Sequence, residues 1–230
     1  MKSKVEPLKI TARLSDHRIN SATGLLFLDC ILYHAWFAKY EPKVFQGLVS
    51  HEKTDMNFGL PLRQLRTESG IRYAASCGFY EQYGFQIEHW NKRPDFTGRN
   101  AIYLDGGGKI DTTKGEYKAY HFPQVIRTVS DIEFYALGTA SKVRDLLTYI
   151  PAVGKKNAAG WGNVSEWIVE EFTEDWTTDG KYGLMRPMPV SEYDANGRTY
   201  TIGECAIRPP AWKACNHTLC YIPKVIVNAD

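Results

Sequence analysis

A strand followed by a helix occurs twice in this chain, and the two units lie far apart in the sequence. Apolar residues alternate over 8–14 and again over 132–137, which is the period of a half-buried strand. Segments with helical spacing follow at 25–39 and 143–150, and a further strand is predicted at 163–172. This order predicts an α+β fold of the ferredoxin-like or RRM-like kind, in which two helices pack on one sheet.

A long insertion separates the two units. We expect residues 1–180 to form the RRM-like domain, with a basic insertion at about 91–127 between its halves. Three consecutive glycines at 106–108 interrupt any regular element, so the insertion is predicted to be a loop or hairpin that projects from the core. Residues 181–230 are rich in proline and aromatic residues. We expect this C-terminal extension to wrap around the same core.

Charge is unevenly distributed along the chain. The net charge of +2 and the pI near 8.2 do not by themselves require nucleic acid as a partner. However, residues 92–127 hold seven Lys or Arg against four acids, whereas residues 165–180 hold six acids and no Lys or Arg. This polarity fits a polyanion on one surface and a protein partner on another. Two solvated faces would explain it equally well.

Neither a membrane span nor a secretory signal is expected. No apolar run approaches the roughly 18 residues of a span, and Met1 to Lys9 lacks an apolar signal region. We therefore expect a cytoplasmic protein with reduced thiols. Four potential zinc ligands cluster near the C-terminus without the usual two-knuckle spacing, so we expect no metal and no cofactor. They are Cys205, Cys215, His217 and Cys220.

A glycine-rich loop at 154–162 lies between the second predicted helix and the last strand. Its three glycines allow positive φ, and its backbone N–H groups together with Lys155 and Lys156 predict a cradle for a phosphate chain. Trp161 could stack on a base, but an anchor that pins the tight turn is the favoured interpretation. Phosphate-binding P-loops and Rossmann turns lead from a strand into a helix, so this loop is neither.

The loop resembles that of the RAMP superfamily of CRISPR-associated proteins, which carries Gly-apolar-Gly after a basic stretch. Gly160-Trp161-Gly162 after Gly154-Lys155-Lys156 matches this pattern. Residues 110–120 resemble a stretch of the small Cas-five-type RAMP subunit of type IV CRISPR effector complexes. Further similarity lies at Phe27-Leu28-Asp29, Trp167, Asp175-Trp176, 185–189 and 207–212. The resemblance spans most of the chain and is weakest over 43–70.

The resemblance implies a non-catalytic RNA-binding subunit that caps the 5′ repeat-derived handle of the crRNA and helps to assemble the interference complex on target DNA. The implied partners are the crRNA, backbone RAMP subunits and a large subunit, and the resemblance also allows contact with target DNA near the protospacer-adjacent motif. The residues implied to contact RNA, or to shape the loop that does, are Gly154, Lys155, Lys156, Asn157, Gly160, Trp161, Gly162, Lys109, Lys114, Tyr117, Lys118 and Tyr120. Lysine and tyrosine together suit phosphate contacts and base stacking.

Two alternatives remain open at this point. Some RAMP proteins cleave crRNA without metal, which needs a general base near the 2′-hydroxyl. His121 is the one histidine in an RNA-facing stretch, although no catalytic residue is the leading expectation. The other alternative is a protein-interaction scaffold that uses the acidic strand and the aromatic tail. Three arginines could reach nucleic acid or form a solvated face: Arg63, Arg66 and Arg72.

Overall fold

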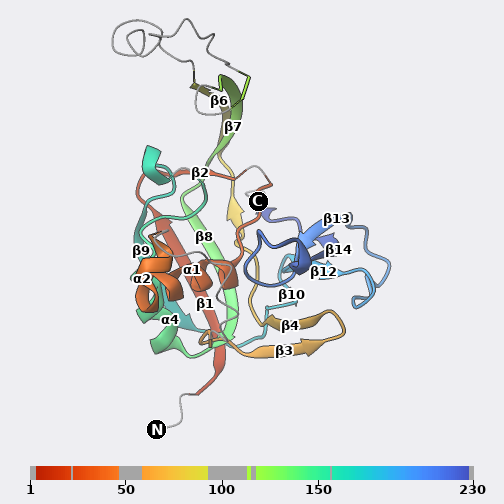
Figure 1. The fold of residues 1–230 in the computed structure, drawn as a ribbon. Helices are drawn as coiled ribbons and strands as arrows, with labels where there is room; N and C mark the ends of the chain where they lie inside the picture. Colours follow the sequence, from red (N-terminus) through yellow and green to blue (C-terminus); the bar gives the residue numbers. More distant parts are fainter. Residues whose placement is uncertain are drawn as a thin grey trace, which may run out of the picture.

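The computed structural model describes residues 4–21, 23–46, 59–92, 113–114, 118–155 and 157–227. Its central sheet has the strand order β8–β1–β9, and β1 is antiparallel to both neighbours. These strands are β1 (Glu6–Leu14), β8 (Asp131–Gly138) and β9 (Val164–Glu171). The helices α1 (Leu28–Tyr40), α2 (Pro42–Phe45) and α4 (Ala140–Leu147) lie on one side of this sheet (Figure 1). The mixed α+β class is therefore as predicted.

Alternation in β1 explains which face the helices cover. Leu8, Ile10 and Ala12 are buried, and the apolar residues that pair with them on β8 are buried too. Helix α1 begins three residues later than the periodicity predicts. The residue before the helix, Phe27, has an extended backbone and forms an antiparallel bridge with Cys77. The chain therefore pairs like a strand up to Phe27, and the helix begins only after it.

A fourth, irregular segment runs along the outer edge of β8. Isolated antiparallel bridges join Ala75 to Ala136 and Phe79 to Glu133, and the N–H of Ser76 donates to the carbonyl of Tyr135 (2.8 Å). From edge to edge, the order is therefore β9, β1, β8 and the segment 75–79. This arrangement places α1 between β1 and that segment in the sequence, and α4 between β8 and β9.

A two-stranded ribbon projects from the core (Figure 1). It consists of β6 (Gly84–Lys92) and β7 (Tyr120–Thr128), and β2 (Arg18–Asn20) pairs with β7 at its base. The two described ends of the predicted insertion, 91–92 and 118–127, lie on or beside this hairpin, whose first strand begins at Gly84, before the expected boundary at 91. Apart from 113–114, the rest of the insertion lies outside the described residues. The ribbon is exposed over most of its length, so periodicity of burial gave no signal for β6.

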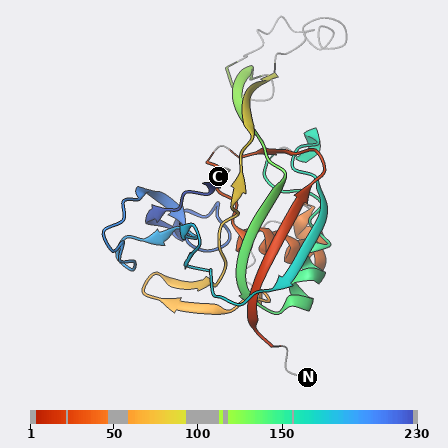
Figure 2. The same cartoon turned by 180° about the vertical axis from the view of Figure 1, so that it is seen from behind.

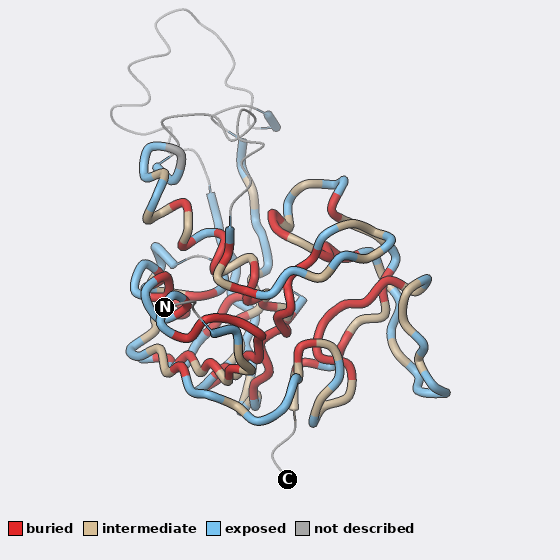
Figure 3. The backbone as a smooth tube through the Cα atoms, turned by 90° about the horizontal axis from the view of Figure 1, so that it is seen from below, coloured by how far each residue is buried: buried red, intermediate tan, exposed pale blue. Residues whose placement is uncertain are grey.

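The remaining strands build the C-terminal part and a lateral hairpin. They are β3 (Gln64–Thr67), β4 (Gly70–Tyr73), β5 (Tyr80–Glu81), β10 (Asp179–Gly180), β11 (Gly183–Leu184), β12 (Met188–Pro189), β13 (Thr201–Ala206), β14 (His217–Ile222) and β15 (Ile226–Val227). The order β12–β14–β13 forms a small sheet, and β15 pairs in parallel with β5. Buried residues continue from the main sheet into this part of the chain (Figure 3).

Arg186 links the C-terminal part of the chain to α1 through its buried side chain. This side chain is fully buried and donates to the carbonyls of Tyr73, Ala75 (2.9 Å) and Ile207 (2.8 Å). It also lies 3.5 Å from the carboxylate of Asp29 at the start of α1. Burial raises the pKa of Asp29, while the nearby guanidinium opposes that shift. Asp29 is therefore a partnered buried acid, as expected, and its role is structural.

Candidate nucleic-acid interface

The glycine-rich loop is folded by its own backbone and by β2. The N–H of Val153 donates to the carbonyl of Gly162 (2.8 Å), and the N–H of Gly162 donates to the carbonyl of Arg18 (2.7 Å). Gly162 has a φ of +74°, and a Cβ there would lie 2.0 Å from the carbonyl oxygen of Val153. Gly154 has a φ of +83°, and a Cβ at that position would lie 2.9 Å from the carbonyl oxygen of Asn20. Both positions therefore require glycine, as predicted.

The predicted cradle of exposed N–H groups is wrong for three positions in this loop. The N–H of Lys155 donates to the carbonyl of Asn20 (2.9 Å), and that of Gly160 to Asn157 (2.8 Å). The N–H of Gly162 is bound as described above. These donors satisfy the chain's own carbonyls, so they cannot also hold a phosphate. Among the described residues of the loop, the positive charge available to a polyanion is the exposed side chain of Lys155.

Two other predicted loop residues differ in exposure. Trp161 is only 7% exposed, so it anchors the loop and does not present a face for stacking. This confirms the favoured interpretation of that residue. Asn157 begins a short exposed 3-10 helix, Asn157–Ala159, and is accessible from solvent. Lys156 lies outside the described residues.

Strand β2 joins the loop to the hairpin. Its residues Arg18 and Asn20 provide the carbonyls that the loop binds, and the same residues pair with Thr128 and Ile126 of β7. In addition, the side-chain amide of Asn20 donates to that of Gln124 (3.0 Å). The glycine-rich loop and the hairpin, which the sequence indicated separately, thus both contact the short strand β2 at the same end of the sheet (Figure 1). Sequence reasoning missed β2, because it lies in a stretch with turn-like composition.

The hairpin carries aromatic rings on one face. Trp90 pairs with Phe122 and Lys92 pairs with Tyr120, so cross-strand register puts all four side chains on the same side. The rings of Tyr120 and Phe122 stack at 5.0 Å, and the indole N–H of Trp90 donates to the hydroxyl of Tyr120 (3.3 Å). Trp90 is 40% and Phe122 53% exposed. We call these four residues the hairpin aromatic face; exposed rings beside a lysine are typical of single-stranded nucleic-acid binding.

The opposite face of the hairpin holds two histidines near its end and the exposed Phe85 near its base. His121 pairs with Asn91 and hydrogen-bonds to its side chain, and the ring of His121 stacks on that of His89 at 4.2 Å and 8°. His121 therefore points away from the hairpin aromatic face, although Tyr120 precedes it directly. The second histidine of this stacked pair had no signal in the sequence, since His89 lies on the other strand.

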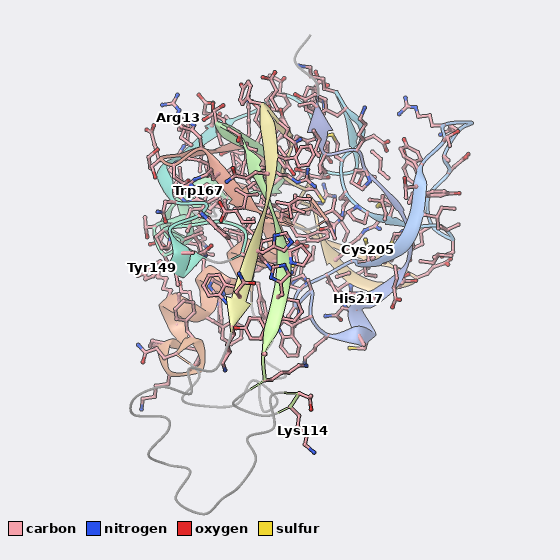
Figure 4. The ribbon with its side chains drawn as sticks, turned by 90° about the horizontal axis from the view of Figure 1, so that it is seen from above. Arg13, Lys114, Tyr149, Trp167, Cys205 and His217 are labelled. Carbon is pink, nitrogen blue, oxygen red and sulfur yellow. The ribbon has the colours of Figure 1, made fainter. Side chains whose placement is uncertain are left out.

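The predicted lysines of the insertion are only partly described. Lys114 and Lys118 are exposed, and Lys114 lies far out from the main body (Figure 4). Lys109 and Tyr117 lie outside the described residues. The structure thus brings Tyr120 and Lys118 to the hairpin end, and it leaves the other predicted contacts of the insertion without a test.

A cavity of about 460 Å³ opens between the glycine-rich loop and α1. Its lining is mostly apolar, and its polar residues are Asn20, Ser21, Thr23, His34, Lys155 and Asn157. This volume lies within the range of small-ligand pockets, about 300–1,000 Å³. The cavity therefore adds space for a small group next to the glycine-rich loop.

Burial distinguishes among two further groups of candidate residues. Arg72 is buried and pairs with Glu192 (3.4 Å), so it does not face nucleic acid, whereas Arg63 and Arg66 are exposed. Near the C-terminus, Cys205 and Cys220 are buried, and burial raises the pKa of Cys220 to about 12.

His217 is engaged elsewhere: its Nε2 donates to the carbonyl of Ala211 (2.6 Å). The part of the chain that the structure describes contains no group of three or more His, Cys, Asp or Glu that could hold a metal ion. Among the described helices, none is long and apolar enough to cross a membrane.

Comparison with known families identifies the class of protein first: this is a protein of the type IV CRISPR systems. The family model described as CRISPR type IV associated protein Csf3 matches residues 80–223, which is more than half of the chain. The chain therefore belongs to the Csf3 family. No curated protein matches it. The predicted type IV CRISPR assignment is confirmed, and the likeness to a Cas-five-type subunit stays a prediction.

Proposed function

We propose that this chain is a non-catalytic RNA-binding subunit that caps the 5′ handle of the crRNA in a type IV effector complex. The observation that carries the proposal is the meeting of two predicted RNA-contacting segments on β2. The exposed rings of the hairpin aromatic face, Arg18 and Lys155 thereby lie at one end of the molecule. A single RNA strand can follow that end from the hairpin to the loop.

The chemistry of this end suits single-stranded RNA. Stacking of a base on an aromatic side chain contributes about 1–3 kcal/mol and tolerates any base. The cations contribute phosphate contacts, which position the strand without reading its sequence. By register, Arg18 pairs with Thr128 and so lies on the same side of β7 as Phe122 and Tyr120. The aromatic rings of the hairpin and the positive charge of Arg18 thus lie along the same side of β7.

The arrangement of the sheet supports a ferredoxin-like, RAMP-type core. The order β9, β1, β8 and segment 75–79 is antiparallel throughout, and each half contributes one helix to the same face. That is the order expected for two interleaved strand–helix–strand units. The glycine-rich loop follows the second helix, as it does in the resemblance described above.

The implied partners follow from this role. In the proposal, the chain binds the crRNA handle, backbone RAMP subunits and the large subunit in the cytoplasm, and it helps to place the complex on target DNA near the protospacer-adjacent motif. Membership of the Csf3 family supports a place in a type IV complex with the other Csf proteins.

The test uses the purified full chain and a labelled RNA with the repeat sequence of its own CRISPR array. We expect salt-sensitive binding without cleavage, and a large loss of affinity in Trp90→Ala. Trp212→Ala is the matched control, because Trp212 is 63% exposed but lies in the C-terminal part. Equal effects of the two variants would rule out the hairpin aromatic face. Absence of binding, even with the neighbouring subunits co-expressed, would rule out the RNA role altogether.

One observation favours the rival function, a metal-independent endoribonuclease. The stacked pair His89 and His121 could supply an acid and a base to one ribose-phosphate. The same repeat RNA tests this in the presence of a chelator. If the wild type cleaves the RNA and His121→Ala binds it without cleavage, the chain is an endoribonuclease and the non-catalytic role is wrong.

A further inference from the structure

The face of the central sheet opposite the helices is not covered by helices (Figure 2). We call it the open sheet face. The side chains that the register places there are Lys9, Thr11 and Arg13 of β1, Asp131, Glu133 and Tyr135 of β8, and Glu166, Ile168 and Glu170 of β9. Four carboxylates thus face two cations, although the whole chain carries a net charge of +2.

Both cations of this face are already neutralised. Lys9 pairs with Glu133 (2.5 Å), and Arg13 pairs with Glu166 (2.8 Å). Asp131 and Glu170 have no ion pair within the described parts of the chain. The surplus negative charge therefore lies at both sides of β1, where a partner's cations could reach it.

A groove of about 500 Å³ borders this face along β8. Phe172, Trp176 and Tyr182 contribute partly exposed aromatic walls, and Phe172 meets Trp176 edge to face at 4.9 Å. The carboxylates of Glu81, Asp131 and Glu133 line the same groove, together with two lysines. Lys9 is paired with Glu133, and the ammonium of Lys181 lies 5.2 Å from the centre of the Tyr182 ring, so of these three walls the rings still open to a partner's cation are those of Phe172 and Trp176. Aromatic faces beside carboxylates are favourable surroundings for a guanidinium or ammonium group, through cation–π contacts and charged hydrogen bonds.

We propose that the open sheet face and its groove dock a basic, arginine- or lysine-bearing segment of a partner protein. Charge complementarity decides the occupant: an RNA strand would meet like charge here, even though sheets of RRM type commonly bind RNA on this face. The one aromatic residue of the three strands on this face, Tyr135, is buried against Phe172 and Trp176 and presents no ring to a base.

This inference does not depend on the RNA role, because the residues involved differ from those of the hairpin–loop end. A chain that bound no RNA could still dock a basic segment here. Conversely, both surfaces can be occupied at once in an assembled complex.

The test is site-specific photocrosslinking in the complex co-expressed from the chain's own type IV locus. A benzophenone amino acid replaces Thr11, at the centre of the open sheet face, or Ser141 on the exposed side of α4 as the control. A separate variant carries the benzophenone amino acid at Ile168, so that the face is still tested if the replacement of Thr11 prevents folding. We expect Thr11 and Ile168, but not Ser141, to crosslink to a segment of another subunit in which Lys and Arg outnumber Asp and Glu.

Charge removal completes the experiment. Asp131→Asn with Glu170→Gln should lower the crosslink yield at least about threefold, whereas Glu204→Gln on exposed β13 should not. Affinity for repeat RNA, measured on the same variants, should stay unchanged. Crosslinks to RNA, to a second copy of this chain or to an acidic segment would overturn the proposal, as would yields no higher than at Ser141.

Discussion

Removing two cations from the β2–loop junction gives the sharpest measure of the RNA path. Arg18 and Lys155 flank the place where β2, the loop and the hairpin meet, and the hydrogen bonds that hold this junction use only their backbone atoms. The double variant Arg18→Gln, Lys155→Gln therefore keeps the hydrogen bonds of the junction. It removes two positive charges and the ion pair between Arg18 and Asp16 (3.9 Å). Its effect on binding should be electrostatic rather than structural.

The magnitude follows from counterion release. Each phosphate neutralised on a single strand contributes about 0.7 to the slope of log affinity against log salt concentration, so two lost contacts flatten the slope by about 1.4. Between about 50 mM and 200 mM salt, the affinity ratio of wild type to variant should therefore shrink by about sevenfold. Weakening that is the same at all salt concentrations would indicate a different cause.

The assay is fluorescence anisotropy with the labelled repeat RNA at several salt concentrations. Lys142→Gln, Lys224→Gln is the matched control, because it removes the same charge from exposed positions on α4 and near the C-terminus. If the control flattens the slope as much as the double variant does, the β2–loop junction is not a phosphate path and the reasoning fails.

Three further predictions concern the scaffold. Gly162→Ala should lower the melting temperature far more than Gly160→Ala, since both have positive φ but only Gly162 lacks space for a Cβ; calorimetry of the two variants checks this. Arg186→Met should cost about 3–5 kcal/mol in urea unfolding, because it leaves Asp29 buried without its partner. Burial raises the pKa of Asp29 above its unfolded value of about 3.9, so the contribution of Asp29 to the unfolding free energy should fall as the pH rises above that value. An asparagine side chain does not titrate, so the variant Asp29→Asn should lack that fall. A pH series of urea unfolding curves for both proteins measures the difference.

The central sheet and its two helices were predictable because burial there is one-sided. β1 alternates between buried helix-facing positions and more exposed open positions, as does the first half of β8, and this period is visible in sequence. In the second half of β8, Tyr135 and Leu137 are buried on the open side as well. β6 had no such signal, since both of its faces are exposed and the pairing to β7 holds it through the backbone. β2 has three residues, too few for any period.

The glycine-rich loop was predictable in residue type but not in geometry. The need for glycine at 154 and 162 follows from a tight turn, and the sequence indicated that turn correctly. Which amides remain free depends on carbonyls more than a hundred residues away, such as those of Arg18 and Asn20, and no local pattern encodes them. The same holds for the hairpin aromatic face, because only the register brings Trp90 opposite Phe122.

The near-neutral net charge of the chain conceals two surfaces of opposite character. Sequence position already separates them, since cations concentrate in 92–127 and acids in 165–180. Of the described residues, Lys92 and Arg127 lie on the hairpin and Lys118 lies next to it, whereas the acids lie on and after β9. A polyanion and a basic protein segment would compete if they shared one surface, because each would be attracted to the other's site. On separate surfaces they bind independently, so variants of Lys155 should change RNA affinity alone and variants of Glu170 should change partner docking alone. A variant at either position that altered both would show that the two surfaces are coupled through the sheet.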